Sequence, residues 1–139
     1  MAARDLYHDA AAEALQKDGW TITNDPLTII YTTREVFVDL GLDRSLLALD
    51  RKGEKIAIEI KTFGSSSQVT DLHRAIGQYV FYDTLLKETD PDRIVFLAID
   101  LKTYEGIFSE PIGELMIRQL TMRLVIFDAD QRSVVKWIS

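Results

Sequence analysis

Apolar and polar residues alternate strictly through residues 56–61, Ile-Ala-Ile-Glu-Ile-Lys. This period of two predicts a strand with the three isoleucines on one face and Ala57, Glu59 and Lys61 on the other. A carboxylate and an ammonium group therefore lie two residues apart on one face of an otherwise apolar strand. We interpret this strand as the element around which the rest of the chain is organised.

The N-terminal half of the chain predicts one helix and then antiparallel strands. The helix has apolar residues at three- and four-residue spacing, and Gly19 suits a left-handed C-terminal cap. Gly41 ends or bulges the strand that carries Asp39, and Gly53 lies in a hairpin loop. The predicted elements are a helix at 4–18, strands at 20–23, 36–40, 46–50 and 55–61, and a segment at 27–31 that extends or crosses the sheet.

The longest predicted helix covers residues 69–87, with Ser67 or Thr70 as its N-cap. An apolar stripe on this helix predicts its buried side: Leu72, Ile76, Tyr79, Val80 and Leu86. Gly77 weakens a helix interior, and the close approach of another backbone would explain it. Asp71, Arg74 and Gln78 recur at three- and four-residue spacing on a different face.

The rest of the chain predicts a buried strand followed by alternating helices and strands. Residues 93–99 are almost continuously apolar, which is typical of a central strand buried on both faces. Pro111 suits the first turn of a helix. The remaining predicted elements are helices at 103–108 and 111–119 and strands at 124–127 and 133–138.

Composition places the chain among single-domain proteins without disulfides. Its 139 residues, 47% of them hydrophobic, predict one domain spanning residues 1–139. It has no cysteine and two histidines, which argues against a disulfide framework, a thiolate zinc site or a multi-histidine metal site. The charged N-terminus fits no signal peptide, and no apolar run reaches membrane-spanning length, so we expect a cytoplasmic protein with no membrane contact.

The formal net charge of −6 disfavours strong non-specific binding to nucleic acid, which basic proteins perform. It leaves nuclease chemistry open, because a site that binds a metal cation is itself acidic. Asp39 and Glu59 are carboxylates of the type that Mg²⁺ or Mn²⁺ prefers. Lys61 is the candidate to position or activate a water or to steady a phosphate.

The order Asp39…Glu59-Ile60-Lys61, after one helix and before another, resembles the PD-(D/E)XK nuclease superfamily. The resemblance implies an α/β fold with a mixed sheet, a restriction-endonuclease-like αβββαβ core followed by a C-terminal helix and strands, and Mg²⁺-dependent DNA cleavage. It also implies an acidic residue of the first helix at the metal, matched by Glu13 with Asp9 as competitor, and a polar helix residue aimed at the site, matched by Gln78. No proline precedes Asp39, so the motif is degenerate.

A second resemblance extends over nearly the whole chain. Segments such as Lys-Asp-Gly-Trp-Thr-Ile-Thr at 17–23, Asn-Asp-Pro-Leu at 24–27, Ala-Ile-Glu-Ile-Lys at 57–61 and Ala-Ile-Gly-Gln-Tyr at 75–79 are similar to the XisH family. That family is cyanobacterial and is named as a controlling factor for excision of the fdxN element in developing heterocysts. The resemblance implies an XisI-like companion protein and a site-specific recombinase as partners.

Simpler interpretations stand beside these. Glu-x-Lys on a strand is common as a solvated cross-strand ion pair, and His8 is more often a surface or core histidine than a ligand. Phe127 and Trp137 are more often core than a platform for bases. Two functions therefore remain open: a metal-dependent endonuclease acting on branched or recombining DNA, and a non-catalytic accessory protein that binds an XisI-like chain or a recombinase. Either can form a homodimer.

Overall fold

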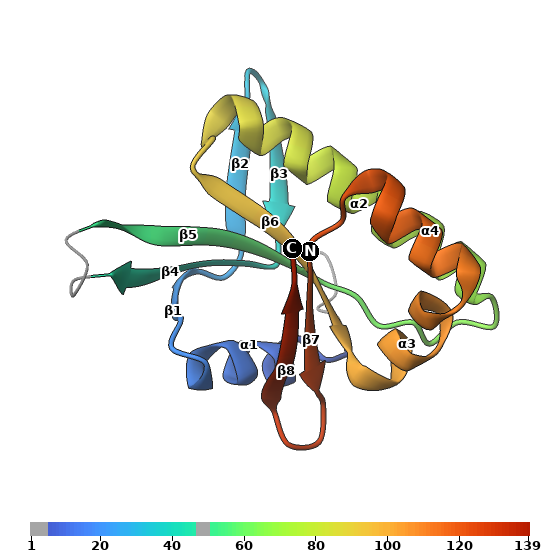
Figure 1. Cartoon of the computed structure of the whole chain (residues 1–139). Helices are drawn as coiled ribbons and strands as arrows, with labels where there is room; N and C mark the ends of the chain where they lie inside the picture. Colours follow the sequence, from blue (N-terminus) through green and yellow to red (C-terminus); the bar gives the residue numbers. More distant parts are fainter. Residues whose placement is uncertain (1–5, 47–50) are drawn as a thin grey trace.

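The computed structural model describes residues 6–46 and 51–139 and has a mixed α/β fold (Figure 1). The start of the first predicted helix and residues 47–50 of the strand predicted at 46–50 lie outside these residues. None of the helices described is long and apolar enough to cross a membrane. The elements are α1 (His8–Lys17), β1 (Thr21–Asn24), β2 (Leu27–Tyr31), β3 (Arg34–Val38), β4 (Leu40–Leu46), β5 (Arg51–Ile60), α2 (Gln68–Thr89), β6 (Arg93–Asp100), α3 (Leu101–Glu105), the 3₁₀ turn η2 (Ile107–Ser109), α4 (Pro111–Leu120), β7 (Leu124–Asp128) and β8 (Ser133–Ile138).

Six strands form the main sheet in the order β1-β4-β5-β6-β7-β8. The central strands β5, β6 and β7 are parallel to one another, and the outer pairs are antiparallel. The crossover from β5 to β6 contains α2, as a parallel connection requires. The strand predicted at 55–61 is present in β5, but its antiparallel partner is β4 (Leu40–Leu46) rather than residues 46–50, of which only Leu46 is described. The predicted central strand is present as β6.

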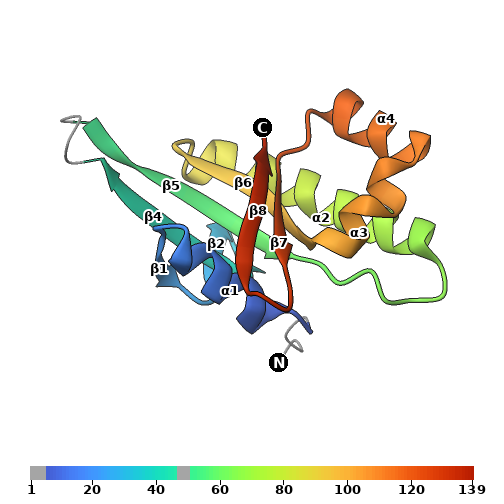
Figure 2. The same cartoon turned by 60° about the horizontal axis from the view of Figure 1, so that its bottom comes forward.

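Helices cover both faces of this sheet (Figure 2). Ile56, Ile58 and Ile60 face a core that they share with α1, whereas Ala57 faces the core beneath α2. The alternation predicted for residues 56–61 is therefore confirmed, and it separates two cores of different composition. Glu59, two residues from Ala57, lies on the α2 side of the sheet.

The strand predicted at residues 36–40 is wrong, because the chain breaks at Asp39. Residues up to Val38 pair with β2 in a separate two-stranded sheet, and Leu40 begins a strand of the main sheet opposite Ile58. The Asp39 side chain accepts a hydrogen bond from the Ile60 N–H at 2.7 Å, so a side chain takes the place of a ladder carbonyl at this point. Asp39 thus lies where the chain passes from one sheet to the other.

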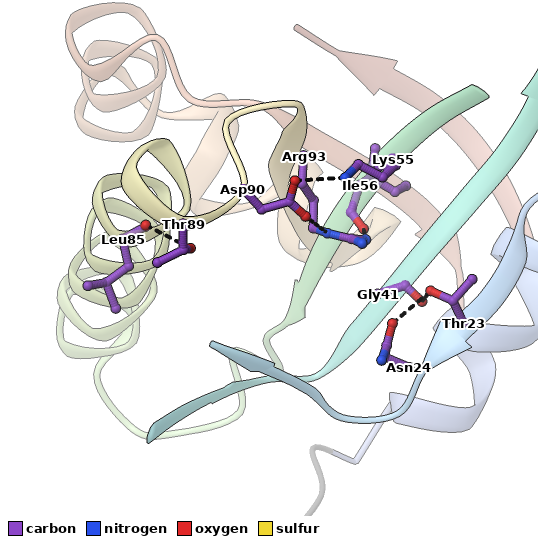
Figure 3. Close-up of polar contacts among 9 residues, drawn as sticks. All are labelled: Thr23, Asn24, Gly41, Lys55, Ile56, Leu85, Thr89, Asp90 and Arg93. Carbon is purple, nitrogen blue, oxygen red and sulfur yellow. Dashed lines mark hydrogen bonds and ion pairs between the residues drawn. The ribbon is translucent and has the colours of Figure 1, made fainter. Parts of the chain in front are cut away.

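Gly41 lies inside β4, opposite the irregularity in the β1–β4 pairing, so of the two predicted roles it has the bulge and not the strand end. The β1–β4 register shifts between Ile22 and Asn24, and Asn24 pairs with Gly41. A Cβ at Gly41 would lie 3.1 Å from Asn24 Oδ1 and 3.2 Å from Leu27 Cδ1. The Thr23 hydroxyl donates to the Gly41 carbonyl at 3.1 Å (Figure 3). Glycine is therefore favoured here by close packing against the Asn24 and Leu27 side chains rather than by a strand end.

The long helix α2 begins as predicted, and the predicted stripe faces the core at Leu72, Tyr79 and Leu86 but not at Val80. Ser67 is its N-cap, and its side chain accepts a hydrogen bond from the Thr70 N–H at 3.2 Å. Val80, predicted to be buried, is 42% exposed, and Tyr82 is buried instead. The prediction of a backbone close to Gly77 is also wrong among the described residues, since a Cβ there would meet none of their atoms within 4 Å.

A cluster of charges fixes the C-terminal end of α2 to the main sheet (Figure 3). The carboxylate of Asp90 accepts from Lys55 Nζ at 2.7 Å and from Arg93 Nε at 3.0 Å. Arg93 also donates to the Ile56 carbonyl at 3.0 Å. Burial raises the pKa of Asp90, but the hydrogen bonds from Lys55 and Arg93 outweigh it and hold this pKa below its usual value.

Candidate functional site

Asp39 and Glu59, both predicted from the sequence, lie together on the α2 side of the sheet. The Ile60 N–H donates to Asp39 Oδ2 at 2.7 Å, and the backbone N–H of Asp39 donates to the Glu59 carboxylate. Each acid is therefore bound by the backbone of the other's segment. This reciprocal arrangement holds the two carboxylates in place although they come from different sheet segments.

Burial raises the pKa of both acids. The Glu59 side chain is 6% exposed. Burial, and then the negative charge of Asp39, raise the pKa of Glu59 to about 7, and Lys61 opposes this shift. Burial likewise raises the pKa of Asp39, against the lowering effect of the hydrogen bond from the Ile60 N–H. The pair therefore retains a proton near neutral pH. A positive charge beside the two acids would stabilise their ionised forms.

Lys61 supplies part of that charge. Its Nζ lies 3.1 Å from Glu59 Oε2, and its side chain is 24% exposed. Its backbone N–H donates to the Ala98 carbonyl at 3.0 Å, which continues the pairing beyond the end of β5. The ammonium group is thus fixed beside the acids while its other side remains open to water.

Tyr82 belongs to this site and was missed by the sequence analysis. Burial raises its pKa, and the charges of Glu59 and Asp39 raise it further, so both acids act on the Tyr82 hydroxyl electrostatically. Tyr82 lies one helical turn after Gln78 on α2. Its four-residue spacing from Gln78, a residue already predicted at the site, could have identified Tyr82 from the sequence. Gln78 itself is half-buried, and its Oε1 has no hydrogen-bond partner among the described residues.

His8 is a buried residue rather than a surface one. It is 3% exposed, and its Nε2 lies 3.0 Å from Asp25 Oδ1. A protonated His8 lowers the pKa of Asp39, after the larger effects of burial and of the Ile60 N–H. His8 therefore lies near enough to the acid pair to act on it electrostatically.

Glu13 takes a different position from the one the resemblance implied. Its carboxylate accepts from Arg132 Nη1 at 2.8 Å and lies 3.8 Å from Lys17 Nζ. Asp9, the competing acid, is exposed in the first turn of α1. Within residues 6–46 and 51–139, no group of three or more His, Cys, Asp or Glu side chains is placed to hold a metal ion.

The acid pair fits a divalent cation held by two protein carboxylates. When Glu59 loses its proton, the half-buried Asp39 and the buried Glu59 carry two negative charges beside one lysine, and a hard cation would neutralise the excess. Mg²⁺ is commonly held by one or two carboxylates together with waters and substrate phosphates. Asp39 and Glu59 are the residues that would hold the ion, and the remaining positions would belong to water or phosphate.

The fold and the site together define a mixed α/β protein with an Asp, Glu-x-Lys centre between a central strand and the long crossover helix. The family model described as XisH protein matches residues 1–135. The chain therefore belongs to the XisH family.

Two solved structures are close relatives. The chain is 35% identical to an XisH family protein from Nostoc punctiforme PCC 73102, with a TM-score of 0.87 over 97% of this chain and 100% of the other. It is 34% identical to an fdxN element excision controlling factor protein from Anabaena variabilis, with a TM-score of 0.86 over 98% of this chain and 100% of the other. No curated protein matches the chain significantly.

Proposed function

We propose that the chain is a nuclease-like protein that takes part in controlling the excision of a DNA element and binds Mg²⁺ or Mn²⁺ at Asp39 and Glu59. The observation that carries this proposal is the pair of buried Glu59 and half-buried Asp39, with Lys61 Nζ 3.1 Å from Glu59 Oε2. The Anabaena variabilis relative supports the biological context, since it is described as a controlling factor for excision of the fdxN element.

In this proposal each residue of the site has a separate role that follows from its position. Asp39 and Glu59 hold the cation, and Glu59 must give up its proton to do so. A bound cation polarises a phosphodiester and lowers the pKa of an attacking water. Lys61 donates a hydrogen bond to a phosphate oxygen or to that water from its open side. We expect Tyr82, together with Gln78 one turn before it on α2, to orient a water or a substrate oxygen.

Isothermal titration calorimetry of Mg²⁺ and Mn²⁺ tests the site. We expect wild type and the matched control Glu13→Gln to bind alike, because Glu13 is paired with Arg132, and we expect Glu59→Gln to lose binding. Since the pKa of Glu59 is about 7, binding should tighten about tenfold from roughly pH 6 to pH 8 as that proton is lost. Equal binding by Glu59→Gln contradicts the proposed site.

Cleavage of branched and linear DNA tests the activity. Glu59→Gln and Lys61→Ala should abolish Mg²⁺-dependent cleavage, while circular dichroism shows that both remain folded. The control is again Glu13→Gln, which should cleave at the wild-type rate. Cleavage retained by both site variants would rule out the acid pair as the catalytic centre.

A second candidate function, a non-catalytic accessory protein, is favoured by the position of Glu13. The third acid of the expected metal site is engaged in an ion pair with Arg132 elsewhere, and the net charge of −6 disfavours autonomous DNA binding. An XisI-like chain or a recombinase would then be the partner. Affinity capture from a native host separates the two functions: wild type and Glu59→Gln should retain the same partner if the role is accessory.

A further inference from the structure

The outward face of α2 has an exposed apolar centre. Val80 is 42% exposed and Phe81 is 52% exposed, although both lie in the middle of the longest helix. A shallow hollow follows this face, and the described residues that line it all belong to α2: Ile76, Gly77, Val80, Phe81, Thr84 and Leu85. Large exposed apolar side chains around a hollow are typical of an interaction surface.

Gly77 lies on this face, and no contact with the described residues requires a glycine there. Glycine weakens a helix interior relative to alanine, and a Cβ at Gly77 would meet nothing within 4 Å. The large ring of Phe81 is exposed one turn further along the same face. A missing side chain beside a protruding one gives a surface that can accept the backbone of a second helix.

The charges at the two ends of the face complement each other. Arg74 and Glu88 are exposed, and within the part of the chain that the structure describes neither forms an ion pair. Lys87, in contrast, is bound to Asp83 at 3.0 Å. Phe81 lies seven residues from Arg74 and seven from Glu88, which is about 10 Å along the helix in each direction.

Because the two opposite charges lie at equal distances on either side of Phe81, we infer that the α2 face binds a second copy of the chain. In an antiparallel pair of α2 helices that cross at Phe81, a two-fold axis places Arg74 of each copy opposite Glu88 of the other. The two apolar centres then meet at the paired Phe81 rings, with the Gly77 backbone of each copy opposite Leu85 of the other. A helix with this pattern is complementary to itself only when the two run in opposite directions.

Sedimentation velocity over a wide range of protein concentration tests the inference. Wild type should be a reversible dimer. Phe81→Asp should raise the dimer dissociation constant more than about tenfold, because a desolvated charge would replace the central ring. Arg74→Glu and Glu88→Arg should each weaken the dimer about tenfold, because each creates two repulsive pairs. The matched control is Arg118→Glu on α4, which should leave the dimer unchanged.

The double variant Arg74→Glu/Glu88→Arg decides the geometry. It should restore dimerisation to within about threefold of wild type, because the two reversed charges meet only between copies. Circular dichroism confirms that each variant is folded. A wild type that is monomeric at every concentration, a dimer insensitive to Phe81→Asp, or a double variant that stays as weak as the single ones overturns the inference.

Discussion

Glu59 holds a proton at a pH where an exposed glutamate has lost it. Its pKa of about 7 follows from burial and from the neighbouring Asp39, and Lys61 offsets only part of these effects. A carboxyl group that is kept neutral in this way is uncommon in a purely structural site. Perturbed acids of this kind concentrate where proteins bind metals or transfer protons.

The pH dependence of stability should report this proton. The folded pKa of about 7 lies above the ordinary value of 4.5, so folded protein binds more protons than unfolded protein between these values. The stability that Glu59 contributes is therefore complete below about pH 4.5 and is lost as pH rises through 7, by about 3 kcal/mol in all.

Urea unfolding of metal-free wild type and Glu59→Gln, measured from about pH 4.5 to pH 8, checks this expectation. The free energy of unfolding of wild type should fall relative to that of the variant as pH rises. A constant difference between the two proteins across this range would show that Glu59 titrates with an ordinary pKa.

At the level of single residues, the sequence predicted the acids but not their surroundings. Period-two alternation placed Glu59 and Lys61 on one face, and a strand carrying Asp39 lay nearby in the chain. The local pattern could not indicate that Asp39 ends a strand, because the Ile60 N–H that binds it is distant in sequence. It could not place Tyr82 either, since the rotation of α2 about its axis is set by tertiary packing.

Among the secondary-structure elements, the packing of α4 against η2 depends on one glycine. A Cβ at Gly113 would overlap the Ile107 carbonyl oxygen and lie 2.6 Å from Phe108 Cα. Backbone atoms cannot yield as flexible side chains do, so this contact accepts no larger residue. Pro111 at the start of α4 was predictable from sequence, whereas this contact between two helical segments was not.

Gly113→Ala should therefore lower the free energy of unfolding by at least about 2 kcal/mol. Gly77→Ala is the matched control, because its added methyl group meets open space and should raise the stability of dilute protein by about 0.5–1 kcal/mol. Chemical denaturation of both variants at low protein concentration compares them. Equal effects of the two substitutions would contradict the packing at Gly113.

Elements with strong periodicity or continuous apolar sequence were predicted well. The central strand β6 alternates between the two cores, with Val95, Leu97 and Ile99 on one side and Phe96 and Ala98 on the other. The separate β2–β3 sheet was not predicted, because residues 27–31 and 36–38 have the pattern of any half-buried strand. Which sheet such a strand joins depends on partners that a local pattern does not specify.

For the whole molecule, one sheet joins two cores. The strands β5 and β6 contribute alternate residues to both, so loss of either core exposes the same strands. Both tryptophans, Trp20 and Trp137, lie on the α1 side, whereas α2 supplies most of the helix on the other side. Tryptophan fluorescence and far-ultraviolet circular dichroism therefore report on different faces.

We expect the two signals to change together in chemical denaturation, with coincident midpoints for wild type. Ile58→Ala, on the α1 side, and Leu97→Ala, on the α2 side, should each cost about 2–5 kcal/mol and shift both signals equally. Separate midpoints for fluorescence and circular dichroism in either variant would show that the two faces unfold independently.

The β2–β3 hairpin ends in a tip that is remote from the acid pair. Asp39 directly follows Val38, which pairs with Leu27 at the open end of the hairpin. At the other end, the exposed residues Thr32 and Thr33 connect the paired residues Tyr31 and Arg34. Added residues at this tip would leave the strand pairing at the base unaltered. The tip is therefore a suitable insertion point for an epitope or a fluorescent reporter, with which the protein can be followed in living cells while both termini stay native.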